Sequence, residues 1–358
     1  MKIIYDFRGT KPPVTGVGHY VLMLYENLIK LDRNNSYIKF DAKDDFFSRY
    51  KTLTNLSPVD NLVEGDIYFS ASLRYFPVRN KPKVTVVHAI TPKMFYKYFS
   101  IKEKLWNALQ KRENDIKEST FIIASSVHTK KDIIKNYHIP ENKIKVVYLG
   151  VDEIYKPIKI SEKELIRKKL KLPQNFILYL GNVHPRKNIT GLLETFALYK
   201  KKFRTNYKLV IAGPIDKSYK NKLDKIIFDC NILNDVIFTG YIKEEDKVYY
   251  YNLADLFLFL PHYEGFGLPP LEAMACGCPV VTSDNSSLTE IIGNNGILID
   301  IKNIDEIAEK INLVLTNKTS RNKLTTNGLT KSKKFSWQKC AKETLKVLEE
   351  AMELYELK

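Results

Sequence analysis

The most informative stretch of this chain is HYEGFGLPPLE, residues 262–272. It follows a continuous apolar run at 256–260, which is typical of a strand covered on both faces in a parallel sheet. Pro269 and Pro270 favour a helix start, because a residue in the first helical turn has no intrahelical partner for its N–H group. Gly277 predicts the end of that helix. A strand, a glycine loop and a helix therefore follow one another, as in parallel α/β sheets.

Apolar strand-like runs alternate with helical patterns along the chain, which predicts an α/β fold with parallel sheets and right-handed crossovers. In the first half we expect strands at 2–6, 66–70, 83–88, 120–124 and 144–148, and helices at 18–31, 102–117 and 128–137. A second series follows the lysine-rich segment 153–173, with strands near 176–181, 207–212, 235–239, 256–260 and 279–282. This restart predicts domains at 1–153 and 154–335, followed by a C-terminal helix within 336–358.

The composition is that of a globular protein. The 358 residues, 44% apolar and 27% charged, suffice for two cores. No stretch is long enough to span a bilayer, and the first apolar run is too short for a signal peptide, so we expect a cytoplasmic protein. The four cysteines form no CxxC pair and have no nearby histidine set, which argues against a zinc site.

The formal net charge of +16 would attract nucleic acid, anionic lipid or small anions. The lysines are scattered over both halves, and the chain carries neither an RNA-binding aromatic signature nor a DNA-reading motif. We therefore expect no nucleic-acid partner. A general bias toward lysine would also produce much of this charge.

Two carboxylates bracket the glycine loop of the opening stretch. Glu264 is expected in the loop and Glu272 in the first helical turn, so both face the carboxyl end of the sheet. The N–H groups of Phe266, Gly267 and Leu268, at the positive end of the helix, favour polar or anionic ligand groups. Paired carboxylates accept hydrogen bonds from the vicinal hydroxyls of sugars and riboses. The pattern favours a sugar-nucleotide site; the alternative is a plain strand-turn-helix unit with two solvated glutamates.

Two further sites carry phosphate chemistry. Arg186 and Lys187 follow the strand near 176–181, where two cations would bind a diphosphate and stabilise the charge on a nucleoside-diphosphate leaving group. The alternative is a solvated basic loop. The loop around Gly16 opens the first helix and would expose N–H groups near a diphosphate, although a tight strand-to-helix turn would need the same glycine.

These motifs, taken as a set, resemble the retaining glycosyltransferases of family 4, which have the GT-B fold of two Rossmann-like domains facing a central cleft. The matching segments are EGFGLPPLEAMACGCPVV (264–281), VTGVGHY (14–20), SSVHTKKDI (125–133), VVYLGVD (146–152), LYLGNVHPRKNI (178–189), LVIAGP (209–214) and VIFTGYI (236–242), with a strand ending in His88. The resemblance implies a hexosyltransferase that retains the anomeric configuration, and a final helix that returns to pack on the first domain.

The resemblance also implies roles for individual residues. Gly16 would contact the donor phosphates, and Arg186 and Lys187 the leaving diphosphate. Glu264 and His88 would bind the donor sugar, Glu272 the ribose, and Tyr241 and Lys243 would frame the base. Ala89, where relatives often have aspartate, and His19, where arginine is frequent, depart from the family pattern. A capped structural role is the alternative for His88.

The chain contains no Asp-x-Asp motif, on which the other large glycosyltransferase architecture holds a metal. Cations and helix N-termini can replace that metal, so we expect neither a required metal nor a cofactor. Mannosyl- and rhamnosyl-type enzymes of bacterial surface polysaccharide and lipopolysaccharide assembly are the most similar, which makes GDP-mannose the first candidate donor and a glycan or lipid-linked glycan the acceptor. A sugar-nucleotide epimerase, a glycan phosphorylase and a non-catalytic sugar-nucleotide-binding subunit remain alternatives.

Segment 93–117 interleaves basic and aromatic residues, and Leu105, Leu109 and Ile116 lie near one face of its expected helix. This pattern predicts peripheral binding to an anionic membrane, on the inner face of the cell membrane. The alternative is that the apolar stripe packs into the first domain and the lysines form its solvated outer face.

Overall fold

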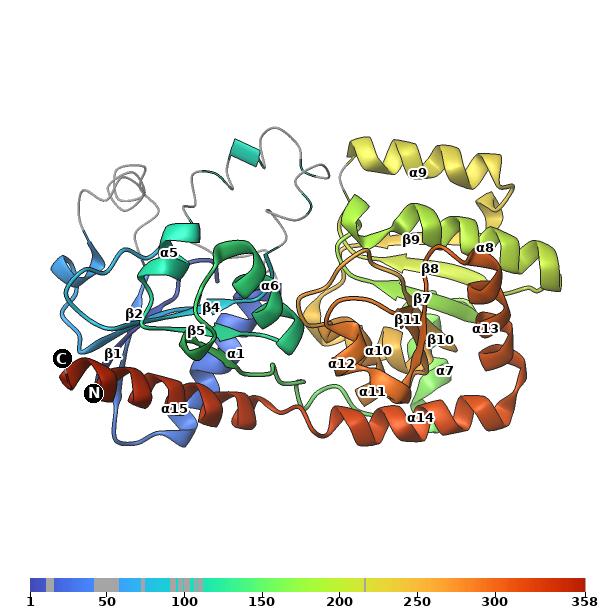
Figure 1. Cartoon of the computed structure of the whole chain (residues 1–358). Helices are drawn as coiled ribbons and strands as arrows, with labels where there is room; N and C mark the ends of the chain where they lie inside the picture. Colours follow the sequence, from blue (N-terminus) through green and yellow to red (C-terminus); the bar gives the residue numbers. More distant parts are fainter. Residues whose placement is uncertain are drawn as a thin grey trace. The chain divides into compact units, whose positions relative to one another are not determined.

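The computed structural model describes residues 1–10, 16–41, 58–71, 75–90, 112–215 and 217–357, together with residues 95, 99, 104, 105 and 108. The chain forms two compact units (Figure 1). The first unit comprises Met1–Gly150 and Ser336–Lys358, and the second comprises Val151–Phe335. The sequence predicts domain boundaries at 153/154 and 335/336.

The described residues of the first unit form a parallel sheet of six strands in the order β2-β1-β3-β4-β5-β6. The strands are β1 (Lys2–Asp6), β2 (Ser36–Phe40), β3 (Ile67–Ser70), β4 (Lys83–Val87), β5 (Phe121–Ala124) and β6 (Ile144–Val146). The helices with described bounds in this unit are α1 (Gly16–Leu31), α5 (Arg112–Glu118), α6 (Val127–Tyr137) and α15 (Trp337–Glu356). Helix α15 packs against α1, so the end of the chain completes the first unit.

The second unit repeats this architecture, with its parallel strands in the order β12-β11-β10-β7-β8-β9. The strands are β7 (Phe176–Leu180), β8 (Lys208–Ala212), β9 (Val236–Gly240), β10 (Leu256–Phe259), β11 (Val280–Ser283) and β12 (Ile297–Ile299). The helices are α7 (Ile160–Lys169), α8 (Ile189–Phe203), α9 (Lys217–Asp229), α10 (Glu244–Leu253), α11 (Leu268–Ala275), α12 (Leu288–Ile291), α13 (Ile304–Thr316) and α14 (Lys318–Ser332).

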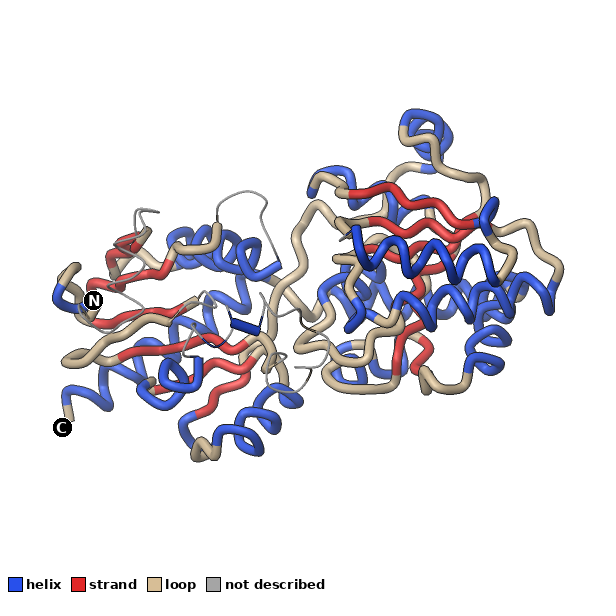
Figure 2. Tube along the Cα trace, turned by 90° about the horizontal axis from the view of Figure 1, so that it is seen from above, coloured by secondary structure: helices blue, strands red, loops and turns tan. Residues whose placement is uncertain are grey.

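The strand order of each sheet reverses once, between β1 and β3 in the first unit and between β7 and β10 in the second. In Figure 2 the strands of each sheet lie side by side with helices around them. Strands β7 and β10 are buried along their whole length, as their continuous apolar sequences predict. Ligands of open parallel sheets bind beyond the carboxyl ends of the strands at such a reversal. In the second sheet, the loops after β7 and β10 occupy this position.

The predicted α/β class with two parallel sheets is confirmed, and the predicted strands fall on the observed ones. Two strands were not predicted, β2 and β12, and both lie at sheet edges. Helix α1 begins at Gly16, two residues before the predicted start at residue 18. Helix α11 contains Pro269 and Pro270 in its first turn and ends before Gly277, as predicted.

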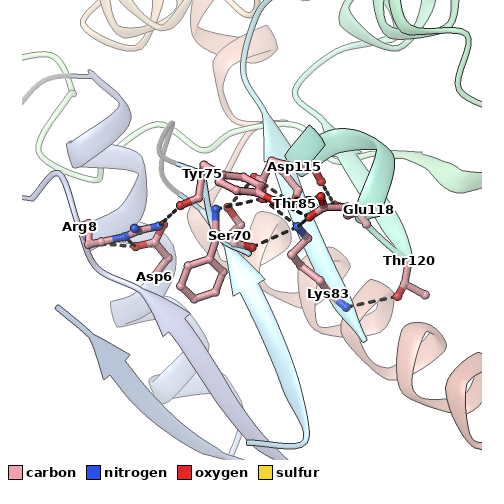
Figure 3. Close-up of polar contacts among 11 residues, drawn as sticks. Asp6, Arg8, Ser70, Tyr75, Lys83, Thr85, Asp115, Glu118 and Thr120 are labelled. Atoms are coloured by element: carbon pink, nitrogen blue, oxygen red, sulfur yellow. Dashed lines mark hydrogen bonds and ion pairs between the residues drawn. The ribbon is translucent and has the colours of Figure 1, made fainter. Parts of the chain in front are cut away.

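A buried polar cluster follows β3 in the first unit (Figure 3). Lys83, only 1% exposed, donates to Asp115 Oδ1 at 2.8 Å and to the Phe76 carbonyl oxygen at 3.1 Å. Asp115 also accepts the Phe76 N–H at 3.1 Å. Buried charges persist only when they are paired and hydrogen-bonded. The cluster therefore fixes both polar groups of the Phe76 main chain, just beyond the carboxyl end of β3.

Candidate functional site

The second unit brings two predicted segments together where its strand order reverses. A short 3₁₀ turn, Pro185–Lys187, follows β7, and the glycine loop 262–267 follows β10. The two strands are hydrogen-bonded neighbours, so the segments meet at one edge of the sheet. The His262 N–H donates to the Arg186 carbonyl oxygen at 3.1 Å, and Arg186 Nη1 donates to the Tyr263 carbonyl oxygen at 2.7 Å. The basic turn and the glycine loop are thus joined by one main-chain hydrogen bond and one donated by the Arg186 side chain.

The charged side chains of these segments form one cluster. Lys187 Nζ donates to Glu264 Oε1, and Arg186 Nη1 lies 3.6 Å from the same oxygen. The side chains of Lys187 and Glu264 are each 12% exposed. Lys187 Nζ also lies 5.1 Å from the centre of the Phe259 ring at the end of β10. The structure therefore places three predicted site residues in mutual contact, in a largely desolvated position.

Burial controls the protonation of this cluster. It lowers the pKa of Lys187 to about 8; Glu264 opposes this shift, and Arg186 adds to it. For Glu264, burial raises the pKa, but the charges of Lys187 and then Arg186 outweigh it, so the pKa lies below its ordinary value. At neutral pH the cluster holds two cations and one carboxylate.

Glycine geometry shapes the loop between the two glutamates. Gly267, the N-cap of α11, has φ +104°, a conformation that favours glycine. A Cβ atom there would also lie 2.7 Å from Leu288 Cδ2. Leu268 begins α11, and the first N–H groups of a helix have no intrahelical acceptor. The main chain around Phe266, Gly267 and Leu268 thus has the conformation of an anion-binding helix start.

Glu272 occupies a different position from the one expected. It is the fifth residue of α11 and lies in the second helical turn rather than the first, because the helix begins at Leu268. Its side chain is 6% exposed, and Oε2 accepts a hydrogen bond of 2.8 Å from the Tyr251 hydroxyl. The carboxylate is therefore held in a fixed orientation by a residue of α10.

Tyr241 and Lys243 lie between β9 and α10, and both are exposed. Lys243 is the N-cap of α10 and makes no side-chain cap hydrogen bond. Lys247 lies in α10, one helical turn after Lys243, and the sequence did not predict it as a site residue. Burial lowers its pKa, but the charges of Glu272 and Glu244 outweigh burial and raise it. Lys247 thus lies in the field of Glu272, a proximity that no sequence spacing signals.

His88 and Gly16 belong to the first unit. The pKa of His88 falls to about 4, chiefly because of burial and despite a backbone hydrogen bond to Ala71, so the ring is neutral at pH 7. Its other nitrogen, Nε2, is buried and has no hydrogen-bond partner among the described residues. The Tyr20 ring packs edge-on against the His88 ring, with 4.4 Å between the two ring centres. A Cβ atom on Gly16, at the start of α1, would meet nothing within 4 Å in the described part of the chain.

Comparison with known proteins identifies the family. Glycosyl transferases group 1 matches residues 161–331, and Glycosyltransferase Family 4 matches residues 62–154. The O-antigen chain mannosyltransferase B of Escherichia coli is 29% identical over 383 residues, covering 96% of this chain and 98% of that protein. The crystal structure of Anabaena HepE, with UDP and glucose, has a TM-score of 0.77 at 18% identity and covers 98% of this chain and 100% of its own. The chain is a GT-B glycosyltransferase.

The glycosyltransferase is also similar to the serotype-specific mannosyltransferase WbdA of Escherichia coli. The two are 30% identical over 223 residues, which cover 62% of this chain and 27% of WbdA. The glycosyltransferase thus matches about a quarter of the length of that relative, whereas it matches mannosyltransferase B over nearly its whole length.

Within the described ranges, no group of three or more His, Cys, Asp or Glu side chains of this glycosyltransferase is arranged to hold a metal ion. Among the helices that the structure describes, none is long and apolar enough to cross a bilayer. Most of segment 93–117, the expected membrane contact, lies outside the described residues. Within it, Leu105 is 63% exposed, whereas Ile116 is buried in a core cluster with Val87 and Ile133. Ile116 therefore packs into the interior of the first unit, as the alternative interpretation of this segment predicts.

Proposed function

We propose that this glycosyltransferase moves a hexose from a nucleoside-diphosphate sugar to a glycan acceptor, with the diphosphate leaving toward Arg186 and Lys187. The observation that carries this proposal is the cluster of Arg186, Lys187 and Glu264 at the strand reversal of the second sheet. Preorganised cations in a desolvated site stabilise a developing negative charge far better than solvated ones do. Gly16, in this proposal, contacts the donor phosphates through its main chain.

The remaining contacts divide between the sugar and the nucleoside. Glu264 binds donor hydroxyls, Glu272 binds the ribose, and Tyr241 and Lys243 frame the base. The neutral His88 ring supports a contact with the donor sugar, because its Nε2 atom is a buried acceptor without a partner among the described residues. An acceptor of this kind suits a sugar hydroxyl, which donates a hydrogen bond.

Retention of the anomeric configuration follows if the acceptor hydroxyl approaches from the face that the diphosphate leaves. The ion pairs of Glu264 support this route over attack by the enzyme, because a carboxylate held by Lys187 and Arg186 is a weakened nucleophile. Proton NMR of the first product tests it. The anomeric coupling of the new linkage should match that of the donor, and an inverted coupling would reject retention. Transfer should also persist in excess EDTA, because Arg186 and Lys187 take the place of a metal.

GDP-mannose is the donor that we propose, since the relatives in O-antigen synthesis are named mannosyltransferases. Release of nucleoside diphosphate, measured with and without a mannan-type acceptor, tests the reaction. Release only in the presence of acceptor supports transfer. Interconversion of the donor sugar without release would indicate an epimerase, and sugar phosphate formed from glycan and phosphate would indicate a phosphorylase. Donor binding without turnover on a broad acceptor panel would indicate a non-catalytic binding subunit.

We also propose that the enzyme associates peripherally with a membrane that holds its acceptor. A chain with a net charge of +16 is attracted to anionic lipid, each lysine near the surface contributing about 1 kcal/mol. The exposed Leu105, next to Lys104, supports contact through segment 93–117. Such contact would bring the enzyme to a lipid-linked glycan on the inner face of the cell membrane.

A further inference from the structure

The segment that follows β11 contacts the glycine loop through two consecutive serines. Ser286 Oγ accepts the Glu264 N–H at 3.0 Å. The Ser287 hydroxyl shares its proton between the carbonyl oxygens of Glu264, at 3.0 Å, and Phe266, at 2.9 Å, and the Ser287 N–H donates to the same Glu264 oxygen at 3.4 Å. Both polar groups of the Glu264 main chain are therefore bound by side chains from a neighbouring strand end.

A second layer of hydrogen bonds supports Ser286. Its hydroxyl donates to Asn285 Oδ1 at 2.8 Å, and Asn285 Nδ2 donates to the Pro261 carbonyl oxygen at 3.0 Å. Ser286 has φ +50°, which is uncommon for a residue other than glycine. Such strain persists only where the surroundings fix it, and it concentrates at functional sites. Ser286 is 8% exposed and Ser287 is fully buried, so neither serves the solvent surface.

The glycine loop needs an external support. Glu264 is followed by Gly265 and Gly267, and glycine leaves the main chain more freedom than any other residue. Ser286 binds the N–H of Glu264 and Ser287 binds its carbonyl oxygen. These two hydrogen bonds restrict the main chain at the residue whose carboxylate forms an ion pair with Lys187.

We propose that Ser286 and Ser287 are positioning residues, a serine clasp that holds the Glu264 carboxylate against Lys187. This inference rests on the proposed function, in which Lys187 receives the leaving diphosphate. Without the clasp, Glu264 moves away from Lys187 and the donor sugar loses its contact. Misplacing a catalytic constellation by about 1 Å costs on the order of a hundredfold in rate, so partial loosening should cost about tenfold.

The test compares Ser286→Gly and Ser287→Ala with Ser283→Ala. Glycine at position 286 relieves the positive φ, so the first variant loses the hydroxyl without a strained backbone. Ser283 is the matched control, because its buried hydroxyl on β11 has no partner in the described part of the chain. The pKa of Lys187 in ligand-free protein, followed by NMR of isotope-labelled lysine, reports the position of Glu264 independently of catalysis. Ser287→Thr, which keeps the hydroxyl, should restore the wild-type value.

The clasp predicts a lower Lys187 pKa in Ser286→Gly and Ser287→Ala, because Glu264 no longer raises it, with the main melting transition retained. Turnover should fall about tenfold in both variants and remain unchanged in Ser283→Ala. A Lys187 pKa at or above the wild-type value in both variants would overturn the clasp. Absence of transfer by the wild-type protein would instead reject the proposed function, and the NMR comparison would still decide the clasp.

Discussion

Lys187 and Glu264 form a buried ion pair at the carboxyl edge of the second sheet, with Arg186 3.6 Å from the same carboxylate oxygen. The carboxylate compensates the two cations in the desolvated site when no anion is bound. A diphosphate would bring further negative charge to Lys187 and Arg186, leaving the Glu264 oxygens available to sugar hydroxyls. In the proposed reaction, one cluster would thus serve both the leaving group and the sugar.

The pKa of Lys187 predicts the pH dependence of the reaction. Burial lowers it to about 8, so the lysine is charged below pH 8 and loses its proton above it. Because the charged form is required, kcat/KM should be level below pH 8 and fall about tenfold per pH unit above it. A rate profile from pH 6 to 10 checks this expectation.

Lys187→Arg provides the control for this profile, since arginine stays charged throughout the range. Its activity will be lower than that of the wild-type enzyme, because the two cations differ in shape, but the basic limb should disappear. A basic limb of unchanged midpoint in Lys187→Arg would assign the titration to another group.

The two glutamates should have separable effects. Glu272→Ala should weaken binding of the free nucleoside diphosphate by about tenfold to a hundredfold, as expected for lost hydrogen bonds to a charged group. Glu264→Ala should spare that binding and reduce transfer. Tyr251→Phe, which removes the hydroxyl that orients Glu272, should weaken nucleotide binding less than Glu272→Ala does. Titration calorimetry measures all three, and the reverse order of the glutamates would exchange their roles.

The buried cluster of the first unit predicts a large effect on stability. Asp115→Ala leaves the Lys83 ammonium group, which is 1% exposed, without its 2.8 Å partner and with the more exposed Glu118, 3.5 Å away, as its remaining carboxylate. Removing one member of a buried pair should lower the free energy of unfolding by about 3–5 kcal/mol. Glu113→Ala is the control, because its ion pair with Lys117 is half exposed and contributes less than about 1 kcal/mol. Urea unfolding compares the variants, and equal midpoints would mean that the Lys83 pair adds little.

Sedimentation with lipid vesicles tests the membrane proposal. The protein should sediment with anionic vesicles at low salt, remain in solution with neutral vesicles, and be released from the anionic ones at high salt. Leu105→Glu should weaken sedimentation, because it replaces an exposed apolar side chain with an anion. Equal sedimentation with both vesicle types would reject a specific preference for anionic lipid.

The sequence predicts every interior strand of the two sheets and misses two edge strands, β2 and β12. Strand β10 is a continuous apolar run, a pattern that turns and surface loops do not produce. Strand β2, at a sheet edge, mixes polar and apolar residues, so it lacks a continuous apolar run. Strand β12, at the edge of the second sheet, has only three residues, which is too short for a clear pattern. The two prolines predict the start of α11 to within one residue. Because the helix begins at Leu268, one residue before Pro269, Glu272 lies in the second helical turn instead of the first.

Contacts between distant segments explain what the sequence could not predict. Arg186 and Lys187 were found by their motif, but their pairing with Glu264 depends on β7 and β10 being neighbours. Ser286 and Ser287 carry no motif, and their contact with Glu264 joins the ends of two strands. Lys247 comes close to Glu272 only because α10 packs against α11.

The central claim is that Arg186 and Lys187 stabilise the leaving diphosphate. Its most direct test is the rate of hexose transfer at saturating donor for the wild-type enzyme, Arg186→Ala and Lys187→Ala. Loss of a preorganised charge contact should lower turnover by about a hundredfold or more in each variant, with the melting profile retained. Near-normal turnover in both variants would contradict the account.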